Sequence, residues 1–491
     1  MKRLVPIVLV LSLALLPAHA PAASAPSGLS QQQAAELITS YDHLTTDFYK
    51  KVNQQAVLDG MRTNLLAYLK GHGVAKPVLA QLHASNDDTA RIEIAREVST
   101  AIAAYAGIIG EAPAKTVESI DPATKKVAIK TTVTGPFKKY GSKLGATNIN
   151  YAAIAGTLSS VNDRYTVFLS PKDFSELNAG LDGTKFGGIG ISYDIDDTTK
   201  LIHVQNVILE GPAEKAGLLT DDVISAVNGQ SVHDLLLGKS TEAQTNIVKS
   251  LLRGEPGTKV QLTLLRGGKT LPDAVSVTRE VIQSPSVYSK LLPNGIGWVQ
   301  LTVFGLDTAH ELTTALNRLD AQGAKAYVLD LRYNGGGYLN AAVDVSSKFI
   351  SSGPIVTVES RAGTNTEYDA ENEAIAPRPL VVLVNNYTAS ASEITAGAIQ
   401  DSGVGTLMGV KTFGKGVVQS IYPLGDGSAV KITTARYVTP HGRDINKIGI
   451  TPDVLATIPK DTKIRLGDLA RDPQLQQAVT YLQGKIAQAT P

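Results

Sequence analysis

The sequence predicts α/β and β modules in succession: a helical N-terminal region, a small β-rich module and an α/β core. Three observations carry this prediction. The chain has 491 residues, which is too long for one ordinary hydrophobic core. The spacing of apolar residues changes along the chain from a helical period to short β-prone runs and then to an alternation of both. The apolar fraction of 43% and the charged fraction of 19% are those of a globular protein.

The N-terminus has the three-part layout of a secretory signal. Lys2 and Arg3 precede an apolar run over residues 4–16, and small residues gather over residues 18–25. The apolar run is shorter than the roughly 20 residues that span a bilayer, although an uncleaved anchor is the alternative. We therefore expect a signal peptide over residues 1–22 and an exported protein. The periplasm is the expected compartment, with secretion or attachment to the cell envelope as alternatives.

The overall composition excludes several classes of partner and chemistry. The formal net charge is +1 and no Lys/Arg run stands out, so nothing supports binding to nucleic acid. Cysteine is absent, which excludes a disulfide framework, a thiol nucleophile and a thiolate metal site. The eight histidines are scattered and form no His-Glu-x-x-His pattern. We expect neither a metal nor another cofactor.

Residues 28–175 are predicted to form the helical region, with an insert-like segment. Apolar residues recur there at intervals of three and four, which predicts helices over residues 31–50, 58–70, 84–106 and 149–158. Residues 107–148 are rich in Gly, Pro, Lys and Thr and are expected to be irregular. Residues 150–175 are expected to contribute to the core that follows.

Residues 178–281 are predicted to form a β-rich module with one helix, Thr241–Leu252. Its first marker is Phe186-Gly187-Gly188-Ile189-Gly190-Ile191, where glycines expose consecutive N–H groups suited to a carboxylate. The strand that follows offers an edge to which an extended peptide can add. The second marker is the stretch Gly-Pro-Ala-Glu-Lys-Ala-Gly-Leu over residues 211–218. Together these stretches resemble a circularly permuted PDZ domain, which implies capture of a C-terminal carboxylate at Gly188, Ile189, Gly190 and Ile191. A purely structural barrel is the alternative.

Residues 286–462 are predicted to form the α/β core, because apolar strands alternate with helices there. The predicted strands span residues 296–301, 326–331, 380–384 and 406–410, and the predicted helices span residues 309–322, 339–349 and 392–401. Residues 463–491 are expected to hold a C-terminal helix, over residues 472–488.

One turn of the core presents two serines. A buried strand over residues 380–384 leads into Thr388-Ala389-Ser390-Ala391-Ser392-Glu393. A serine at the start of a helix lies where free N–H groups favour developing negative charge. Ser390-x-x-Glu393 is also a capping box, so Ser390 could equally be a helix cap, and Ser392 competes for either role.

A lysine in a glycine-rich stretch could supply the base that a serine nucleophile needs. Phe413-Gly414-Lys415-Gly416 brings Lys415 between two glycines that allow close backbone approach, and burial can keep a lysine amine neutral. Gln419 lies four residues further on. Along a strand this spacing puts both side chains on one face, so Gln419 could orient the amine. A solvated lysine and an uninvolved glutamine are the alternatives.

A third turn could stabilise an oxyanion. Asn334-Gly335-Gly336-Gly337 joins a buried strand to the helix over residues 339–349, so its N–H groups point into the mouth of the core. In acyl transfer such a donor is worth about 3 kcal/mol. The turn could equally bind phosphate, but no Gly-Lys-Ser/Thr follows, which disfavours a nucleotide loop. A Ser–His–Asp triad is the remaining catalytic alternative, with His441, in a turn beside Gly442, as its candidate.

In this order the stretches resemble the carboxyl-terminal processing, or tail-specific, serine protease family. The resemblance implies that Ser390, rather than Ser392, is the nucleophile and that Lys415 is the general base. It also implies that Gln419 orients Lys415 and that the N–H groups of Gly336 and Ala391 form the oxyanion hole.

The resemblance extends from about Tyr151 to the end of the chain, with two departures. Where the family usually has Asp-Pro-Tyr/His-Ser, this chain has Asp163-Arg164-Tyr165-Thr166. Residues 75–148 are also longer than the usual N-terminal region. These departures concern substrate access and assembly rather than the chemistry.

The resemblance implies an exported serine endopeptidase that recognises protein substrates by their C-terminal tails and cleaves through an acyl-enzyme. The alternatives are a PDZ-bearing binding or scaffold protein without turnover and a protease held inactive until a partner binds. An adaptor or activating partner and a homo-oligomer stay open.

Overall fold

The computed structural model describes residues 28–106, 114–120, 127–133, 144–182, 186–208, 211–282, 286–459, 462 and 464–489. The predicted signal peptide, residues 1–22, lies outside these residues. The chain divides into two compact units, Met1–Asp42 with Val52–Asn162 and His43–Lys51 with Asp163–Pro491. In the described part of the chain, no helix has the length and hydropathy needed to cross a membrane.

The first unit is mainly helical, as predicted. Its helices are α1 (Gln31–Asp47, whose last residues belong to the second unit), α2 (Gln54–Gly71), α3 (Asp87–Tyr105) and α5 (Ala146–Ser159). Two glycines let α2 and α5 pack closely. A Cβ added to Gly60 would lie 2.6 Å from the Cβ of Ser160, and one added to Gly156 would lie 2.9 Å from the Cβ of Asn64.

The expectation of irregular structure over residues 107–148 is wrong for two strands. β1 (Ala114–Ile120) and β2 (Val127–Val133) pair antiparallel along their whole length. Both segments contain several Val, Ile and Thr residues, whose branched side chains favour the extended backbone. The composition rich in Gly, Pro and Lys describes their surroundings rather than the strands.

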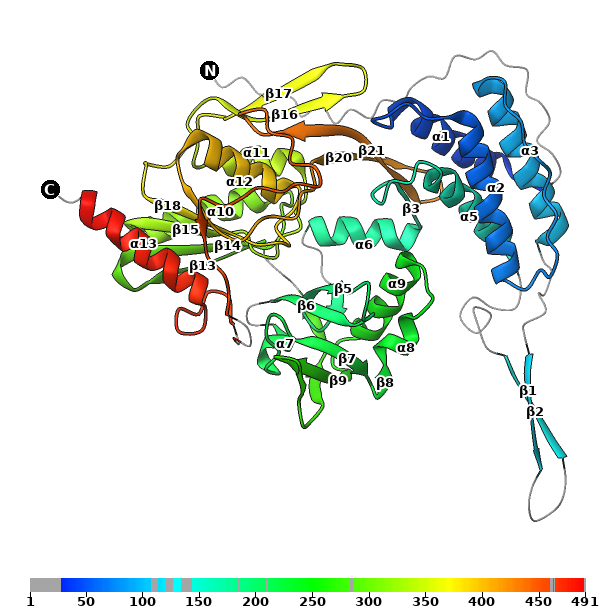
Figure 1. The fold of residues 1–491 in the computed structure, drawn as a ribbon, viewed down its shortest axis with the longest axis horizontal. Coiled ribbons are helices and arrows are strands. Elements are labelled where there is room, and N and C mark those ends of the chain that lie inside the picture. Colours follow the sequence, from blue (N-terminus) through cyan, green and yellow to red (C-terminus); the bar gives the residue numbers. More distant parts are fainter. Residues whose placement is uncertain are drawn as a thin grey trace. The chain divides into compact units, whose positions relative to one another are not determined.

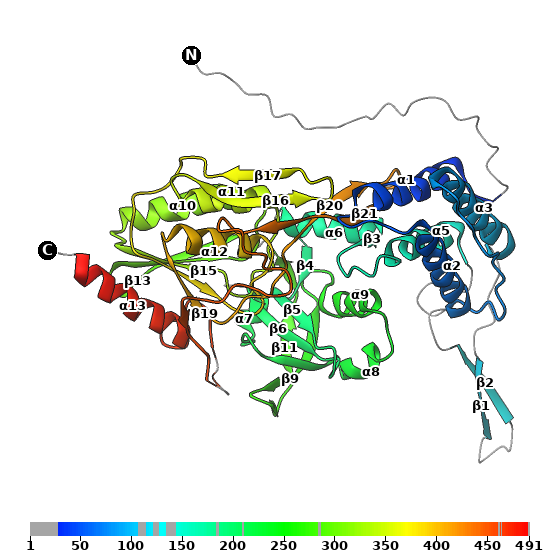
Figure 2. The ribbon, with the colours of Figure 1, turned by 45° about the horizontal axis from the view of Figure 1, so that its top comes forward.

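The β-rich module lies within the second unit's long segment. Its strands and helices are β4 (Phe186–Gly188), β5 (Ile191–Ile195), β6 (Ile202–Val207), α7 (Pro212–Lys215), β7 (Val223–Val227), β8 (Gln230–Ser231), α8 (Val232–Leu236), α9 (Thr241–Leu252), β9 (Lys259–Arg266), β10 (Lys269–Thr270), β11 (Val275–Thr278) and β12 (Glu280–Ile282). The main path of the sheet runs β10-β9-β7-β6-β5, and the last strand, β12, pairs with the first, β4. The first and last strands of the module thus form a separate two-stranded sheet, and α8 and α9 lie beside the strands of the main sheet (Figure 2).

The core is a three-layer α/β arrangement. Its sheet has the order β13-β14-β15-β18-β19-β22, and all pairs except β13–β14 are parallel. The strands are β13 (Val287–Leu292), β14 (Ile296–Leu301), β15 (Ala326–Asp330), β18 (Leu380–Val384), β19 (Thr406–Gly409) and β22 (Val454–Leu455). The helices are α10 (Thr308–Ala321), α11 (Leu339–Ser347), α12 (Ala391–Ser402) and α13 (Pro473–Ala489). These bounds confirm the predicted alternation to within two residues.

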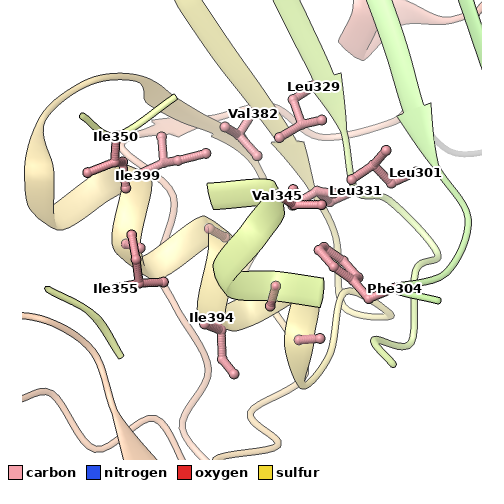
Figure 3. Close-up of a cluster of buried hydrophobic side chains, with 14 of the residues drawn as sticks. Leu301, Phe304, Leu329, Leu331, Val345, Ile350, Ile355, Val382, Ile394 and Ile399 are labelled. Atoms are coloured by element: carbon pink, nitrogen blue, oxygen red, sulfur yellow. The ribbon is translucent and has the colours of Figure 1, made fainter. Parts of the chain in front are cut away.

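The two faces of this sheet bury different helices (Figure 1). Leu301, Leu329 and Val382 face α10, α11 and α12, where they pack with Val345 and Ile394 (Figure 3). The alternate positions on the same strands, such as Trp298, Val328 and Leu383, pack against α13. Successive strand residues point to opposite faces, and this explains why β14, β15 and β18 are buried at every position.

A second, antiparallel sheet joins the core to the segment before the β-rich module. Its strands are β16 (Pro354–Ser360), β17 (Asn365–Asp369), β20 (Val417–Pro423), β21 (Ala429–Val438) and β3 (Val167–Leu169), in the order β17-β16-β21-β20 with β3 on β21. β3 leads into α6 (Pro171–Leu181). Residues 163–175 thus belong to the second unit, because β3 pairs with β21, whereas residues 150–162 belong to the first. The helical region ends at Asn162 rather than at residue 175.

A buried ion cluster ties the C-terminal helix to the core sheet. Arg332 follows β15, is fully buried, and pairs with Asp330 and Asp472, each at 2.6 Å. Gln474 and Trp298 complete the cluster with hydrogen bonds of 2.9 and 3.1 Å. Burial alone would lower the pKa of Arg332, but the two carboxylates hold it well above its ordinary value. The guanidinium therefore stays charged and fixes the chain just before the glycine turn.

Candidate active site

Ser390 lies in a strained turn between β18 and α12. Its backbone has φ 59° and ψ −121°, a conformation that non-glycine residues seldom adopt. Ordinary helix caps have extended backbones, as Ser170 and Ser240 have in this chain (ψ 162° and 157°). The capping-box pattern is present, because the Glu393 carboxylate accepts from the Ser390 N–H at 3.0 Å. The backbone, however, is that of a sharp strand-to-helix turn that presents a serine hydroxyl.

The glycine turn after β15 lies directly against Ser390. Gly336 has φ +100°, and a Cβ added there would come within 2.9 Å of the Ser390 Cβ and of the Ala391 N. Asn334 joins the two turns, since its carbonyl accepts from the Ala389 N–H at 3.1 Å and from the Ser392 hydroxyl at 2.9 Å. Only glycine fits this contact.

The N–H of Gly336 is engaged in this structure. It donates to Oδ1 of Asn334 at 2.9 Å, while Nδ2 of Asn334 donates to the Leu301 carbonyl at 2.9 Å. Gly336 therefore lies where the sequence placed it, but its N–H would have to turn from Asn334 to serve an oxyanion. Ala391 is the first residue of α12, where backbone N–H groups lack helical partners.

The Glu393 carboxylate joins the serine turn to the lysine loop. Its oxygens accept from the N–H groups of Ser390 (3.0 Å), Gly414 and Lys415 (each 2.8 Å) and from the Thr412 hydroxyl. Burial raises the pKa of Glu393, although these hydrogen bonds act in the opposite direction. One side chain thus fixes the backbones that carry Ser390 and Lys415.

Lys415 is half-buried, near two positively and two negatively charged side chains. Burial lowers the pKa of Lys415 to about 8; Lys431 and Arg164 lower it, and Glu393 and Asp163 raise it. Its Nζ lies 5.0 Å from the centre of the Tyr165 ring. A lysine whose pKa lies near neutrality can act as a general base.

Tyr437 is a further link between the two segments, one that no sequence motif indicated. Its hydroxyl is buried and contacts the carbonyl oxygens of Lys415 at 2.6 Å and of Ser390 at 3.1 Å. In the sequence Tyr437 was one apolar position of a strand. No motif pointed to its hydroxyl, because the contact arises only when β21 lies beside the loop.

Gln419 and Lys415 do not lie on one face of a continuous strand. Lys415 precedes β20, and the strand register shifts between Val418 and Gln419, so the alternation of faces is broken. Nε2 of Gln419 instead makes long contacts to the Val417 carbonyl (3.4 Å) and the Thr433 hydroxyl (3.5 Å). An orienting role for Gln419 stays a prediction.

The other candidate catalytic groups lie elsewhere. Ser392 is fully buried, with its hydroxyl on Asn334. His441 is exposed and lies 3.6 Å from Asp401, near the C-terminal end of α12. Ser390 is at the other end of that helix, about 16 Å away at 1.5 Å per residue. A triad of Ser390 with His441 is therefore excluded. Among the residues that the structure describes, no group of three or more His, Asp or Glu side chains could hold a metal ion.

The strand to which a peptide is expected to add, β5, has an unpaired edge in the described residues. In the described residues β5 pairs with β6 and has no strand on its other side. Partly buried apolar side chains of β5 and α9 pack against the module's core there: Ile191, Tyr193, Ile247 and Leu251. Gly190, with φ +78°, forms the turn before β5, and an added Cβ would lie 3.3 Å from Pro212. The two marker stretches thus contact each other.

Comparisons with known proteins agree with this architecture. Residues 295–456 match peptidase family S41, and residues 187–277 match the PDZ domain. The chain is 36% identical over 341 residues to the carboxyl-terminal-processing protease of Synechocystis sp., which covers 69% of this chain and 78% of that protein. It is 39% identical over 333 residues to the carboxy-terminal processing protease CtpA of Bacillus subtilis, covering 68% and 67%. The solved photosystem II D1 C-terminal processing protease superimposes with a TM-score of 0.55 at 27% identity, covering 87% of this chain and 94% of that one.

The fold and the matches to known families together identify this protein as a serine peptidase with an embedded PDZ domain. The chain belongs to the carboxyl-terminal-processing protease family, within peptidase family S41.

Tyr437→Phe tests whether the buried hydroxyl holds the two segments together. The change removes the Tyr437 donor from the Lys415 carbonyl, whereas the Ser390 carbonyl still accepts from the N–H groups of Glu393 and Ile394. It should lower the free energy of unfolding by about 1–3 kcal/mol and reduce peptidase activity. Tyr368→Phe on β17, at a half-buried position, is the control and should change stability by less than about 0.5 kcal/mol. Denaturant titration measures both. If the two variants are equally stable, the bridging role is wrong.

Proposed function

We propose that this protein is an exported endopeptidase that holds protein C-termini in its PDZ domain and cleaves with Ser390 as nucleophile and Lys415 as base. The observation that carries the proposal is the strained Ser390 backbone at the start of α12, tied by Glu393 to the half-buried Lys415. A serine that served only as a cap would need no such strain.

In the proposed reaction, neutral Nζ of Lys415 accepts the hydroxyl proton of Ser390 as Oγ bonds to the substrate carbonyl carbon. The carbonyl electron pair moves to oxygen, and the N–H groups of Ala391 and Gly336 stabilise this oxyanion. When the oxyanion collapses, the C–N bond breaks and the Lys415 ammonium returns the proton to the leaving amine. A water molecule, deprotonated in the same way, then hydrolyses the ester and restores Ser390.

Ser390→Ala and Lys415→Ala should each lower kcat/KM on an unfolded protein substrate by about 10³-fold or more. Lys411→Ala, at an exposed lysine near the loop, is the matched control and should keep wild-type activity.

Because only the neutral amine is a base, kcat/KM of the wild type should rise with pH up to about 8 and then level off. A Lys415→Ala variant with normal activity would exclude this mechanism.

Two observations support recognition of C-terminal tails: the free edge of β5 and the glycine turn before it. An extended peptide can add to such an edge, with its carboxylate in the turn. The inactive Ser390→Ala protein should bind a fluorescent peptide with a free C-terminus at least about tenfold more tightly than the same peptide amidated, since a charged acceptor is lost. Equal affinities would argue against this recognition.

Export is supported by the N-terminal pattern of Lys2, Arg3 and the apolar run that follows. The protein recovered from a cell-envelope or periplasmic fraction should begin at Ala23. N-terminal sequencing measures this directly. Recovery of full-length protein from the cytosol alone would contradict export.

A further inference from the structure

The loop Asp163-Arg164-Tyr165-Thr166, in which this chain departs from the family pattern, is fixed beside Lys415. The Asp163 carboxylate accepts from the hydroxyls of Thr166 (2.7 Å) and Thr433 (2.5 Å), and the Thr433 N–H donates to the Thr166 hydroxyl at 3.1 Å. The next residues form β3, which pairs with β21. The backbone of Arg164 and Tyr165 is therefore anchored at both ends of the loop.

Arg164 stacks on two rings that belong to the site. Its guanidinium carbon lies 5.1 Å from the centre of the Tyr165 ring and 5.4 Å from that of Phe413. Phe413 precedes Lys415 by two residues, and the Tyr165 ring also contacts Nζ of Lys415 at 5.0 Å. Two cationic side chains thus share one aromatic ring, a contact that favours cations over the ring face.

Four charged groups act on the Lys415 amine. Lys431 on β21 and Arg164 are positive, and Glu393 on α12 and Asp163 are negative. Glu393 and Asp163 each accept several hydrogen bonds. Arg164 makes no ion pair with a carboxylate within the part of the chain that the structure describes. Its charge is therefore available to act on Lys415.

We propose that Arg164 is a positioning residue for Lys415: its stacking on Tyr165 and Phe413 holds the guanidinium beside the amine, where its like charge opposes the protonation of Lys415. The inference rests on the proposed role of Lys415 as base. It assigns a task to the one position of this loop where a charged residue replaces the proline of the family pattern.

The pH dependence of kcat/KM tests the proposal. Arg164→Met retains a long, unbranched aliphatic stem but removes the charged guanidinium. The rising part, or limb, of the kcat/KM profile of this variant should therefore move to higher pH by about 0.3–0.5 unit. At a pH below the midpoint, its kcat/KM should be about two- to threefold lower than that of the wild type. Arg164→Lys keeps the charge, and its limb should stay closer to that of the wild type. Arg96→Met on α3, at an exposed arginine, is the control and should leave the limb in place. Coincident limbs for Arg164→Met and the wild type would overturn the proposal.

A second measurement separates this inference from the proposed function. The pKa of Lys415 can be measured without turnover by NMR of the Ser390→Ala protein labelled with ¹³C at Cε of lysine. The Lys415 resonance is assigned as the one that is missing from the double variant Ser390→Ala/Lys415→Arg. Arg164→Met should raise the titration midpoint, and the difference should shrink in 1 M salt, where the screening length is about 3 Å. A wild type without peptidase activity would contradict the proposed function, whereas an unchanged midpoint would contradict only the role of Arg164.

Discussion

The arrangement of the site depends on the buried carboxylate of Glu393. It accepts hydrogen bonds from the backbones of Ser390, Gly414 and Lys415 and from the Thr412 hydroxyl. A buried carboxylate is costly unless it is fully hydrogen-bonded, and these donors meet that requirement. Because it accepts from both segments, the carboxylate holds the serine turn next to the lysine loop. The side chain that the sequence offered as half of a capping box thus fixes both segments at once.

The two turns are adjacent because they follow neighbouring parallel strands. β15 and β18 pair in the core sheet, so the glycine turn and the serine turn leave it at the same edge. Beneath the glycine turn, the buried cluster of Arg332, Asp330 and Asp472 fixes the strand end. The next residue, Tyr333, stacks on Tyr387 of the serine turn at 5.3 Å, and its hydroxyl donates to Asp221 of the PDZ domain at 3.2 Å. The site is therefore in direct contact with the domain that would hold the substrate tail.

Burial and charge act together on Lys415. Burial disfavours the charged amine, and Lys431 and Arg164 act in the same direction. The carboxylates of Glu393 and Asp163 oppose this effect but are themselves engaged by several donors. Family membership accounts for the serine-peptidase class and the PDZ domain. The position of Arg164 on the Tyr165 ring comes from the structure of this chain.

The sequence by itself determined the elements and the candidate residues. The apolar periods placed β14, β18 and α9 at their observed bounds, because a buried strand or helix face leaves a direct pattern in the sequence. It could not distinguish a helix cap from a nucleophile at Ser390, since both need the same residue types. The tertiary structure adds an observation that residue types cannot supply: the positive φ of Ser390, in contact with Gly336 and hydrogen-bonded to Glu393. It also decided what spacing could not: the bulge that shifts Gln419, the engaged N–H of Gly336 and the bridge at Tyr437 all arise where distant segments meet.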